Sequence, residues 1–459
     1  MKKKTKTIIG IIVGLVFIAC MCALKYYGYV SSRIGAAGSY SDSGSPYTWD
    51  ISLRSFNGTL KKPLFSETGF IKFTSQADSG LITVTVENDK QVVCKETISG
   101  SDTLIIPVWG RTIVSVKAED FTGSVNAAAN VTETVTSGNI YLYGEAHADE
   151  DILDYEFETW KEYYDSGMRD LFIEDPYYTA QFMNLWMKAS DDTIFDEIYA
   201  DWEGSQAYSQ VVRDFYFRIK RECPETVFHG IDVGHQYDTT GARYLKYLAD
   251  NGFSETSEEY ILASVCIEQG KVFYNDDDYA YRETQMAYNF VREYQTMNGK
   301  PIMGIFGTTH TELGGMNYGS GKVPSLGNYL ARIYGDVVSN TNLVELVRLQ
   351  SAEVVSTETI TLYGKEYTAS YYGSMDLSAV LPEYQSRDVW RIEDAYEDFK
   401  DVPTTGNVLP YDNYPMNIEA GQVFKIVYTK KDGTVIVEYH RCDGMEWLGK
   451  LSTEQMDLQ

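Results

Sequence analysis

The alternation of apolar strands with helical segments that begins at Gly138 constrains the fold of this chain more than any other feature. Parallel strands need a crossover of about a dozen residues or more, usually a helix, whereas antiparallel strands can be joined by a short turn. The alternation therefore predicts a mostly parallel sheet with helices on its faces, an α/β domain over residues 138–350. The four runs read as strands are "NIYLYGEAH", "DLFIED", "VFHGIDV" and "PIMGIFGTTH".

The sequence on either side of this region has a different pattern. Residues 47–136 hold closely spaced alternating runs rich in Val, Ile and Thr, bounded by Gly, Asp and Asn, which predict a small all-β sandwich. Residues 31–46 are small and polar without an apolar period, as is typical of a linker. In residues 351–459 the clearest signal is a hairpin with an Asp-Gly turn, so we expect a C-terminal extension of the α/β domain.

The N-terminus has the features of a membrane-targeting segment. Four lysines precede an uncharged, mostly apolar run over residues 8–24, which is at the lower limit for a spanning helix. We therefore expect a signal anchor over residues 1–30, a single-pass protein of the cell membrane, and residues 31–459 outside the cell. A lipoprotein attached through Cys20 is the alternative. The predicted fold class is thus an α/β domain preceded by a small all-β sandwich and an N-terminal transmembrane anchor.

Composition excludes one class of partner. The chain has 39 Lys and Arg against 66 Asp and Glu, a formal charge of −27. A phosphate backbone would be repelled by this charge, so no nucleic-acid partner is expected. The six cysteines lie too far apart, or too close to the N-terminus, to suggest a metal site by their spacing.

Ionisable residues lie at or near the ends of all four predicted strands. Ligands of open α/β sheets bind outside the carboxyl ends of the strands, so these residues are expected to meet at one edge. A single histidine there is more often structural than catalytic, but here histidines recur near three strand ends. The residues concerned are Glu145 and His147, Glu174 and Asp175, His229 and Asp232, and His310.

The residues at the end of the first predicted strand could act as a general base. Residues two apart in a strand point to the same face, so Glu145 and His147 can face one locus. A carboxylate beside an imidazole orients the ring and raises its basicity, and the imidazole can then take a proton from water. Histidines 229 and 310 recur at comparable positions, which favours a shared site.

The other candidates have more specific roles. Glu174 is favoured over Asp175, because Asp175 precedes a proline and could cap the following helix. Arg282 lies on a predicted helix before the fourth strand, from which a guanidinium could stabilise an oxyanion. His229 and Asp232 are expected to contact substrate.

Five of these segments together resemble a known superfamily. In chain order, "GEAH", "FIED", "HGID", "RETQMAYN" and "FGTTH" are similar to motifs of the erythromycin esterase-like and ChaN-like proteins, over residues 138–320. The resemblance implies an α/β fold with its site at the strand ends. One residue separates the first Glu and His here, which is closer to the ChaN-like pattern than to the esterases. The positions matched are Glu145, His147, Glu174, Arg282 and His310.

Two functions of different classes follow from these observations. The first is a hydrolase of ester or amide bonds, acting on a small-molecule or peptide substrate, with His147 as base, Glu145 orienting it, Arg282 stabilising the oxyanion and His310 assisting proton transfer. A variant has a divalent metal held by His147, His310, Glu145 and Glu174. The second, implied by the ChaN-like resemblance, is a protein that binds haem or another small molecule without turnover.

Overall fold

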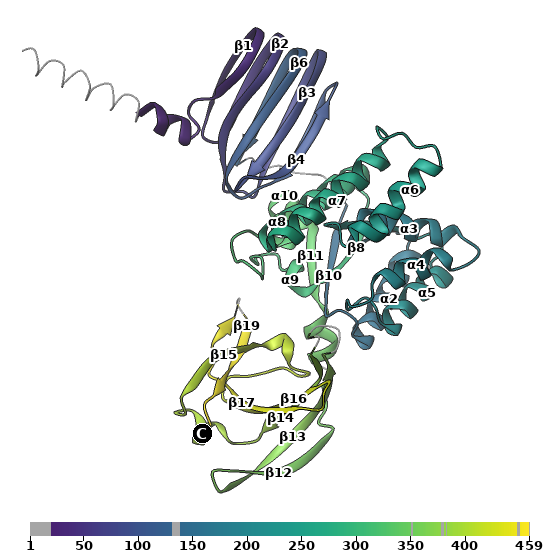
Figure 1. Cartoon of the computed structure of the whole chain (residues 1–459). Helices are drawn as coiled ribbons and strands as arrows, with labels where there is room; N and C mark the ends of the chain where they lie inside the picture. Colours follow the sequence, from purple (N-terminus) through teal and green to yellow (C-terminus); the bar gives the residue numbers. More distant parts are fainter. Residues whose placement is uncertain are drawn as a thin grey trace, which may run out of the picture.

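The computed structural model describes residues 20–458 apart from 131–137, 350–351, 378–380, 382 and 448–449. Within these residues the strands form three sheets of six, five and eight strands. The sheets follow one another along the molecule, with the five-stranded sheet and its helices in the middle (Figure 1). The outer two sheets are antiparallel and the middle one is parallel.

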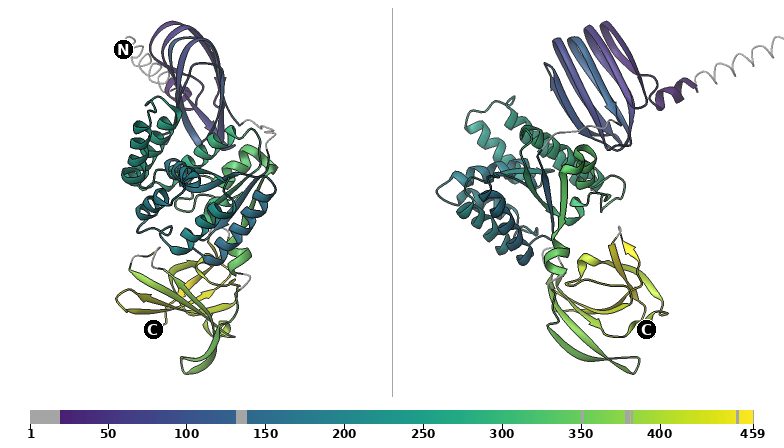
Figure 2. Two further views of the ribbon diagram at one scale, coloured as in Figure 1. Left: turned by 90° about the vertical axis from the view of Figure 1, so that its right-hand side faces the viewer. Right: turned by 180° about the vertical axis from the view of Figure 1, so that it is seen from behind.

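The first sheet is built from long strands in the order β1-β2-β6-β3-β4, with β5 paired to β3. Register shifts near the middle of the β2–β6 and β3–β6 pairs bend these strands, and Figure 2 shows them arching over. Alternating apolar residues meet inside, where Trp49, Phe56 and Phe121 are fully buried. The strands are β1 (Ser32–Ser45), β2 (Thr48–Ser66), β3 (Phe70–Asn88), β4 (Gln91–Ile98), β5 (Asp102–Pro107) and β6 (Gly110–Ala129).

The segment predicted as a linker, residues 31–46, contains the edge strand β1. Its side chains are small and mostly exposed, so no apolar alternation marks it. It pairs with β2 through the backbone from Ser32 to Ser45. Backbone pairing needs no particular side chain, which is why this strand has no signal in the sequence.

The middle sheet is parallel, in the order β11-β7-β10-β8-β9. Its strands are β7 (Ile140–Glu145), β8 (Asp170–Pro176), β9 (Val227–Asp232), β10 (Ile302–Gly307) and β11 (Val338–Asn342). The helices between them are α2 (Glu150–Asp165), α3 (Tyr177–Lys188), α4 (Thr193–Asp201), α5 (Gln210–Glu222), α6 (Ala242–Asp250), α7 (Glu258–Asp276), α8 (Tyr279–Thr296), α9 (Thr308–Thr311) and α10 (Leu326–Tyr334). Short turns of other helix types cover Tyr237–Gly241, Gly335–Val337 and Val344–Leu349.

Helices cover both faces of the parallel sheet because successive strand residues point to opposite sides. Leu142 of β7 packs in one cluster with residues of α8 and α10, such as Met286. Its neighbour Tyr143 packs in the opposite cluster with residues of α2 and α3, such as Ile152 and Met183. All five side chains are buried, which fixes the sheet between two helical layers and leaves the strand ends free to form a site.

The third sheet has the order β12-β13-β14-β16-β17-β19-β15, with β18 paired to β19. The strands are β12 (Ser356–Leu362), β13 (Lys365–Asp376), β14 (Tyr384–Ile392), β15 (Thr404–Pro410), β16 (Gln422–Lys430), β17 (Val435–Cys442), β18 (Glu446–Trp447) and β19 (Lys450–Met456), with α11 (Tyr396–Phe399) and a turn at Tyr411–Asn413. Phe424 and Ile426 of β16 pack on one face, and Val423 packs in a separate cluster.

The predicted fold class is therefore wrong for the chain as a whole. The mostly parallel sheet is the smallest of the three, and antiparallel sheets lie on both sides of it. Residues 351–459, expected to extend the α/β domain, form a separate antiparallel sheet with its own apolar clusters. Parallel strands are recognisable in a sequence as continuous apolar runs, because both of their faces are buried. The C-terminal strands are half-exposed and rich in Tyr, Ser and Thr, so they give no such signal.

No helix in the described part of the chain is long and apolar enough to cross a membrane. A spanning helix needs about 20 mostly apolar residues. Of the predicted anchor over residues 1–30, residues 20–26 are helical with exposed side chains, and residues 1–19 lie outside the described residues. This finding corrects the prediction of a transmembrane anchor, of the membrane as a partner and of a single-pass location with residues 31–459 extracellular.

Candidate active site

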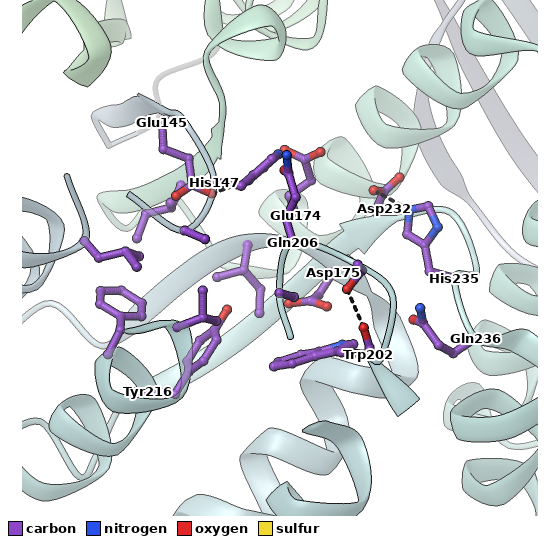
Figure 3. Close-up of a pocket in the computed structure, with 18 of the residues that line it drawn as sticks. Glu145, His147, Glu174, Asp175, Trp202, Gln206, Tyr216, Asp232, His235 and Gln236 are labelled. Carbon is purple, nitrogen blue, oxygen red and sulfur yellow. Dashed lines mark hydrogen bonds and ion pairs between the residues drawn. The ribbon is translucent and has the colours of Figure 1, made fainter. Parts of the chain in front are cut away.

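The carboxyl ends of the parallel strands open onto a cavity of about 340 Å³. Strands β7, β8 and β9 end in residues that line it, and α8 contributes a side chain from its first turn. Figure 3 shows Glu145, Glu174 and Asp232, from the three strands, around one space. Five of the seven residues predicted from the sequence line this cavity: Glu145, His147, Glu174, Asp232 and Arg282.

Glu145 and His147 form a hydrogen-bonded pair in the cavity wall. Glu145 is the last residue of β7, and the chain turns after His147, where Ala148 has a φ of 59°. Nδ1 of His147 lies 2.7 Å from Oε1 of Glu145, and the His147 side chain is 39% exposed. Burial lowers the pKa of His147, but the charge and hydrogen bond of Glu145 and the charge of Glu174 outweigh it and raise the pKa to about 9. His147 therefore holds an extra proton at neutral pH.

Arg282 is held by two carboxylates, Glu174 of β8 and Asp232 of β9. Its Nε lies 3.0 Å from Oδ1 of Asp232, and its Nη2 lies 2.5 Å from Oδ2 of Asp232 and 2.7 Å from Oε1 of Glu174. These bonds use three of the five N–H donors of a guanidinium. Among the described residues, Nη1 contacts Nε2 of His310 at 3.5 Å, a weak interaction, so Nη1 can still donate to a ligand.

The Arg282 cluster stays ionised across the physiological range. Burial raises the pKa of Glu174, but the charges of His310, His147 and Arg282 outweigh it and lower the pKa to about 2. Burial also raises the pKa of Asp232, and Arg282 and His235 lower it far below its usual value. Opposite charges at these distances favour the charged forms, so the cluster presents a fixed cation to the cavity.

His310 supports this cluster from behind the cavity. It lies in α9, just after β10, and its Nδ1 is 2.8 Å from Oε2 of Glu283. Glu283 also accepts hydrogen bonds from the backbone N–H of Leu326 at 2.6 Å and from Nδ2 of Asn317 at 2.9 Å. Nε2 of His310 lies 3.5 Å from Oε1 of Glu174. Burial lowers the pKa of His310, but Glu283 and Glu174 outweigh it and raise the pKa.

Gly307 lies close to both His147 and Glu174 and leaves room for their side chains. The backbone N–H of Gly307 donates to Oε2 of Glu174 at 2.7 Å. A Cβ atom at position 307 would lie 3.2 Å from Nε2 of His147 and 3.4 Å from Oε2 of Glu174. A side chain at this position would require the His147 ring to shift by a few tenths of an ångström.

The remaining predicted histidine lies elsewhere. His229 is buried in β9, stacked on Phe172 with ring centroids 4.7 Å apart. Its Nε2 lies 3.1 Å from Oδ1 of Asp170 at the start of β8, and its Nδ1 lies 3.5 Å from Glu293. His229 does not line the cavity. His235 does, and its Nε2 lies 2.9 Å from Oδ2 of Asp232.

Two further acidic residues of the site share a signal that sequence reasoning missed. Glu156 lies among Ile152, Leu153, Phe157 and Trp160 on the buried face of α2. Glu283 likewise lies on the buried face of α8 with Met286, Ala287 and Phe290. An acidic residue on the apolar stripe of a helix must be paired or neutral, so each was recognisable as a functional or structural exception.

The side chains do not fit a divalent metal. Within the described residues, no three His, Cys, Asp or Glu side chains are arranged to hold a metal ion. Of the set considered from the sequence, Glu174 is bound to Arg282 at 2.7 Å, and Nη1 of Arg282 lies 3.5 Å from Nε2 of His310. A guanidinium in this position would repel a dication.

No family model and no curated protein matches this chain. Solved structures that match part of this chain include an erythromycin esterase variant in its open conformation, at 11% identity and a TM-score of 0.35, covering 56% of this chain and 83% of that one. A succinoglycan biosynthesis protein shares 13% identity at a TM-score of 0.34, and the match covers 56% of this chain and 77% of that one. A Bacillus cereus protein shares 13% identity at a TM-score of 0.31, and the match covers 44% of this chain and 65% of that protein. This chain therefore spans just under two thirds of that protein's length. These likenesses are too distant to bear on activity.

Proposed function

We propose that this chain hydrolyses ester or amide bonds and that His147 takes the proton from the attacking water. The observation that carries the proposal is the Glu145–His147 pair in the wall of a cavity that Arg282 also lines. A positioned imidazole and a fixed cation are the two elements that water-mediated acyl transfer needs. Glu145 accepts a hydrogen bond from Nδ1 of His147, which leaves Nε2 as the nitrogen that can accept a proton.

The reaction can be written with the groups that are present. In the neutral form, Nε2 of His147 accepts a proton from water while the oxygen attacks the carbonyl carbon. The carbonyl oxygen becomes an oxyanion, to which Nη1 of Arg282 can donate. The carbon–oxygen or carbon–nitrogen bond then breaks, and the imidazolium returns its proton to the leaving alcohol or amine. The products are a carboxylic acid and that leaving group.

Glu174, Asp232 and His310 are positioning residues in this account. Glu174 and Asp232 fix the guanidinium of Arg282 through bonds of 2.5 to 3.0 Å. His310 contacts Glu174 and is itself fixed by Glu283. Because His310 does not line the cavity, we assign it this supporting role in place of direct proton transfer.

Hydrolysis of a panel of activated substrates tests the proposal. We expect the chain to hydrolyse p-nitrophenyl acetate, p-nitrophenyl butyrate or acyl p-nitroanilides with saturable kinetics above the buffer rate. The matched control is the His440→Gln variant, which changes a histidine of the third sheet and should retain the activity. A rate equal to buffer on every substrate, with the folded chain confirmed by circular dichroism, would contradict the proposal and favour binding without turnover.

A further inference from the structure

The cavity has a second acidic wall that the proposed reaction does not use. Glu156 of α2 is fully buried and lines the cavity. Neither of its carboxylate oxygens has a hydrogen-bond partner among the described residues. A buried carboxyl without a partner is strongly disfavoured as an anion, so such a group needs a specific explanation.

Asp175 and Tyr216 line the same cavity, and burial together with the charges of Asp175 and Glu156 raises the pKa of Tyr216. Asp175 follows Glu174 at the end of β8, and Tyr216 comes from α5 (Figure 3). Burial raises the pKa of Glu156, with a further contribution from the charge of Glu145. Burial, with the charges of Asp232 and Glu174, likewise raises the pKa of Asp175. Both shifts favour the neutral form of these carboxyls in the empty cavity.

The cationic side chains near this wall are already paired with other carboxylates. Arg282 is bound to Asp232 and Glu174, and His147 is bound to Glu145. No ion pair to Glu156 or Asp175 occurs among the described residues. The wall therefore has two carboxyls that can ionise when a cation arrives.

Aromatic rings complete the wall. Trp202, Phe215 and Tyr216 line the cavity beside Leu153 and are all nearly buried. The faces of aromatic rings carry negative charge density and attract cations, most strongly where water is excluded. The chain as a whole has a charge of −27, which attracts cationic ligands and repels anionic ones.

We infer that Glu156, Asp175 and the surrounding rings form a subsite for an ammonium group carried on a compact apolar body. The inference depends on the proposed function only in calling that ligand a substrate. Its ammonium group would donate to the carboxyl oxygens of Glu156 and Asp175, while its apolar part would contact Trp202 and Phe215. The bond to be hydrolysed would then extend toward His147.

Binding of a cation is coupled to proton release. The raised pKa values favour the protonated carboxyls in the empty cavity, and a bound ammonium favours their ionised forms, so the complex holds fewer protons than the free protein wherever the empty cavity is protonated. Affinity for a cation must therefore increase as the pH rises toward the raised pKa of these groups. Affinity for a neutral ligand of the same shape gains nothing from this ionisation.

Calorimetric titration of the full chain with two isosteric probes tests the inference. Benzylammonium carries the charge, and benzyl alcohol has almost the same shape without it. We expect the wild type to bind benzylammonium about tenfold more tightly than benzyl alcohol or better, with a preference that is larger at about pH 8 than at about pH 6. Glu156→Gln should remove the preference, because the amide keeps the shape and cannot ionise.

The matched control is Glu158→Gln, on the same helix, where the carboxylate is exposed and paired with Arg218 at 3.0 Å. This variant should bind both probes as the wild type does. Asp175→Asn provides a second test if Glu156→Gln does not fold. Equal binding of the two probes, tighter binding of benzyl alcohol, or no binding of either would overturn the inference. Loss of hydrolysis with the preference intact would instead count against the proposed function alone.

Discussion

Replacing His147 by glutamine is expected to lower kcat/KM for ester hydrolysis by about 10²- to 10⁴-fold, the contribution of a positioned general base. Glutamine keeps a polar group within reach of Glu145 but cannot accept a proton from water. KM should change little, because His147 acts on the attacking water more than on substrate binding. The measurement is steady-state kinetics with the best substrate of the ester panel.

Stability does not explain such a loss, because the His147 side chain is 39% exposed. Unchanged circular dichroism and thermal unfolding of His147→Gln would confirm this. His440→Gln provides the histidine control in another sheet. A His147→Gln variant within about twofold of wild type would show that another group activates the water.

Replacing Arg282 by glutamine is expected to destabilise the parallel sheet by about 3–5 kcal/mol. The side chains of Asp232, Glu174 and Arg282 are only 1%, 11% and 15% exposed. Without the guanidinium, these two buried carboxylates would lose the cation that binds both of them. The free energy of opening is best measured by hydrogen exchange on peptides from the parallel sheet, since three separate sheets need not unfold together.

A surface arginine provides the comparison. Arg221 pairs with Glu222 at 2.7 Å but is 64% exposed, so Arg221→Gln should cost less than about 1 kcal/mol. Adding Asp232→Asn to Arg282→Gln should recover part of the loss, because it removes one of the unpaired charges. An Arg282→Gln variant as stable as Arg221→Gln would mean that the cluster is not held by these ion pairs.

The parallel sheet left clear signals in the sequence because its strands are buried on both faces. Strands β7, β8, β9 and β10 coincide with continuous apolar runs, and the ionisable residues at their ends follow from the rule for open sheets. Strand β11 has the sequence VSNTN and was not recognisable, since it lies at the sheet edge and is only partly buried. The C-terminal hairpin between β16 and β17 was visible through its Asp-Gly turn, but its neighbours were not.

The site, like the fold, could be predicted from the sequence only in part. Local spacing could suggest the Glu145–His147 pair, because both residues lie at one strand end. It could not show that Arg282 would be enclosed by Asp232 and Glu174, since those contacts join residues 50 and 108 positions apart. Nor could it separate His229, at a comparable position in its strand, from the cavity, because the side of the sheet to which a ring points depends on the packed helices.

The pH dependence of kcat/KM for wild type and Glu145→Gln tests the central claim most directly. A general base that is neutral only above its pKa gives a rate that rises about tenfold per pH unit and then levels off. For wild type the plateau should begin near the pKa of His147, about 9. Removing the Glu145 charge should move this limb to lower pH, because that charge is the largest influence raising the pKa. A wild-type limb below neutral pH, or one that Glu145→Gln leaves in place, would contradict a His147 base.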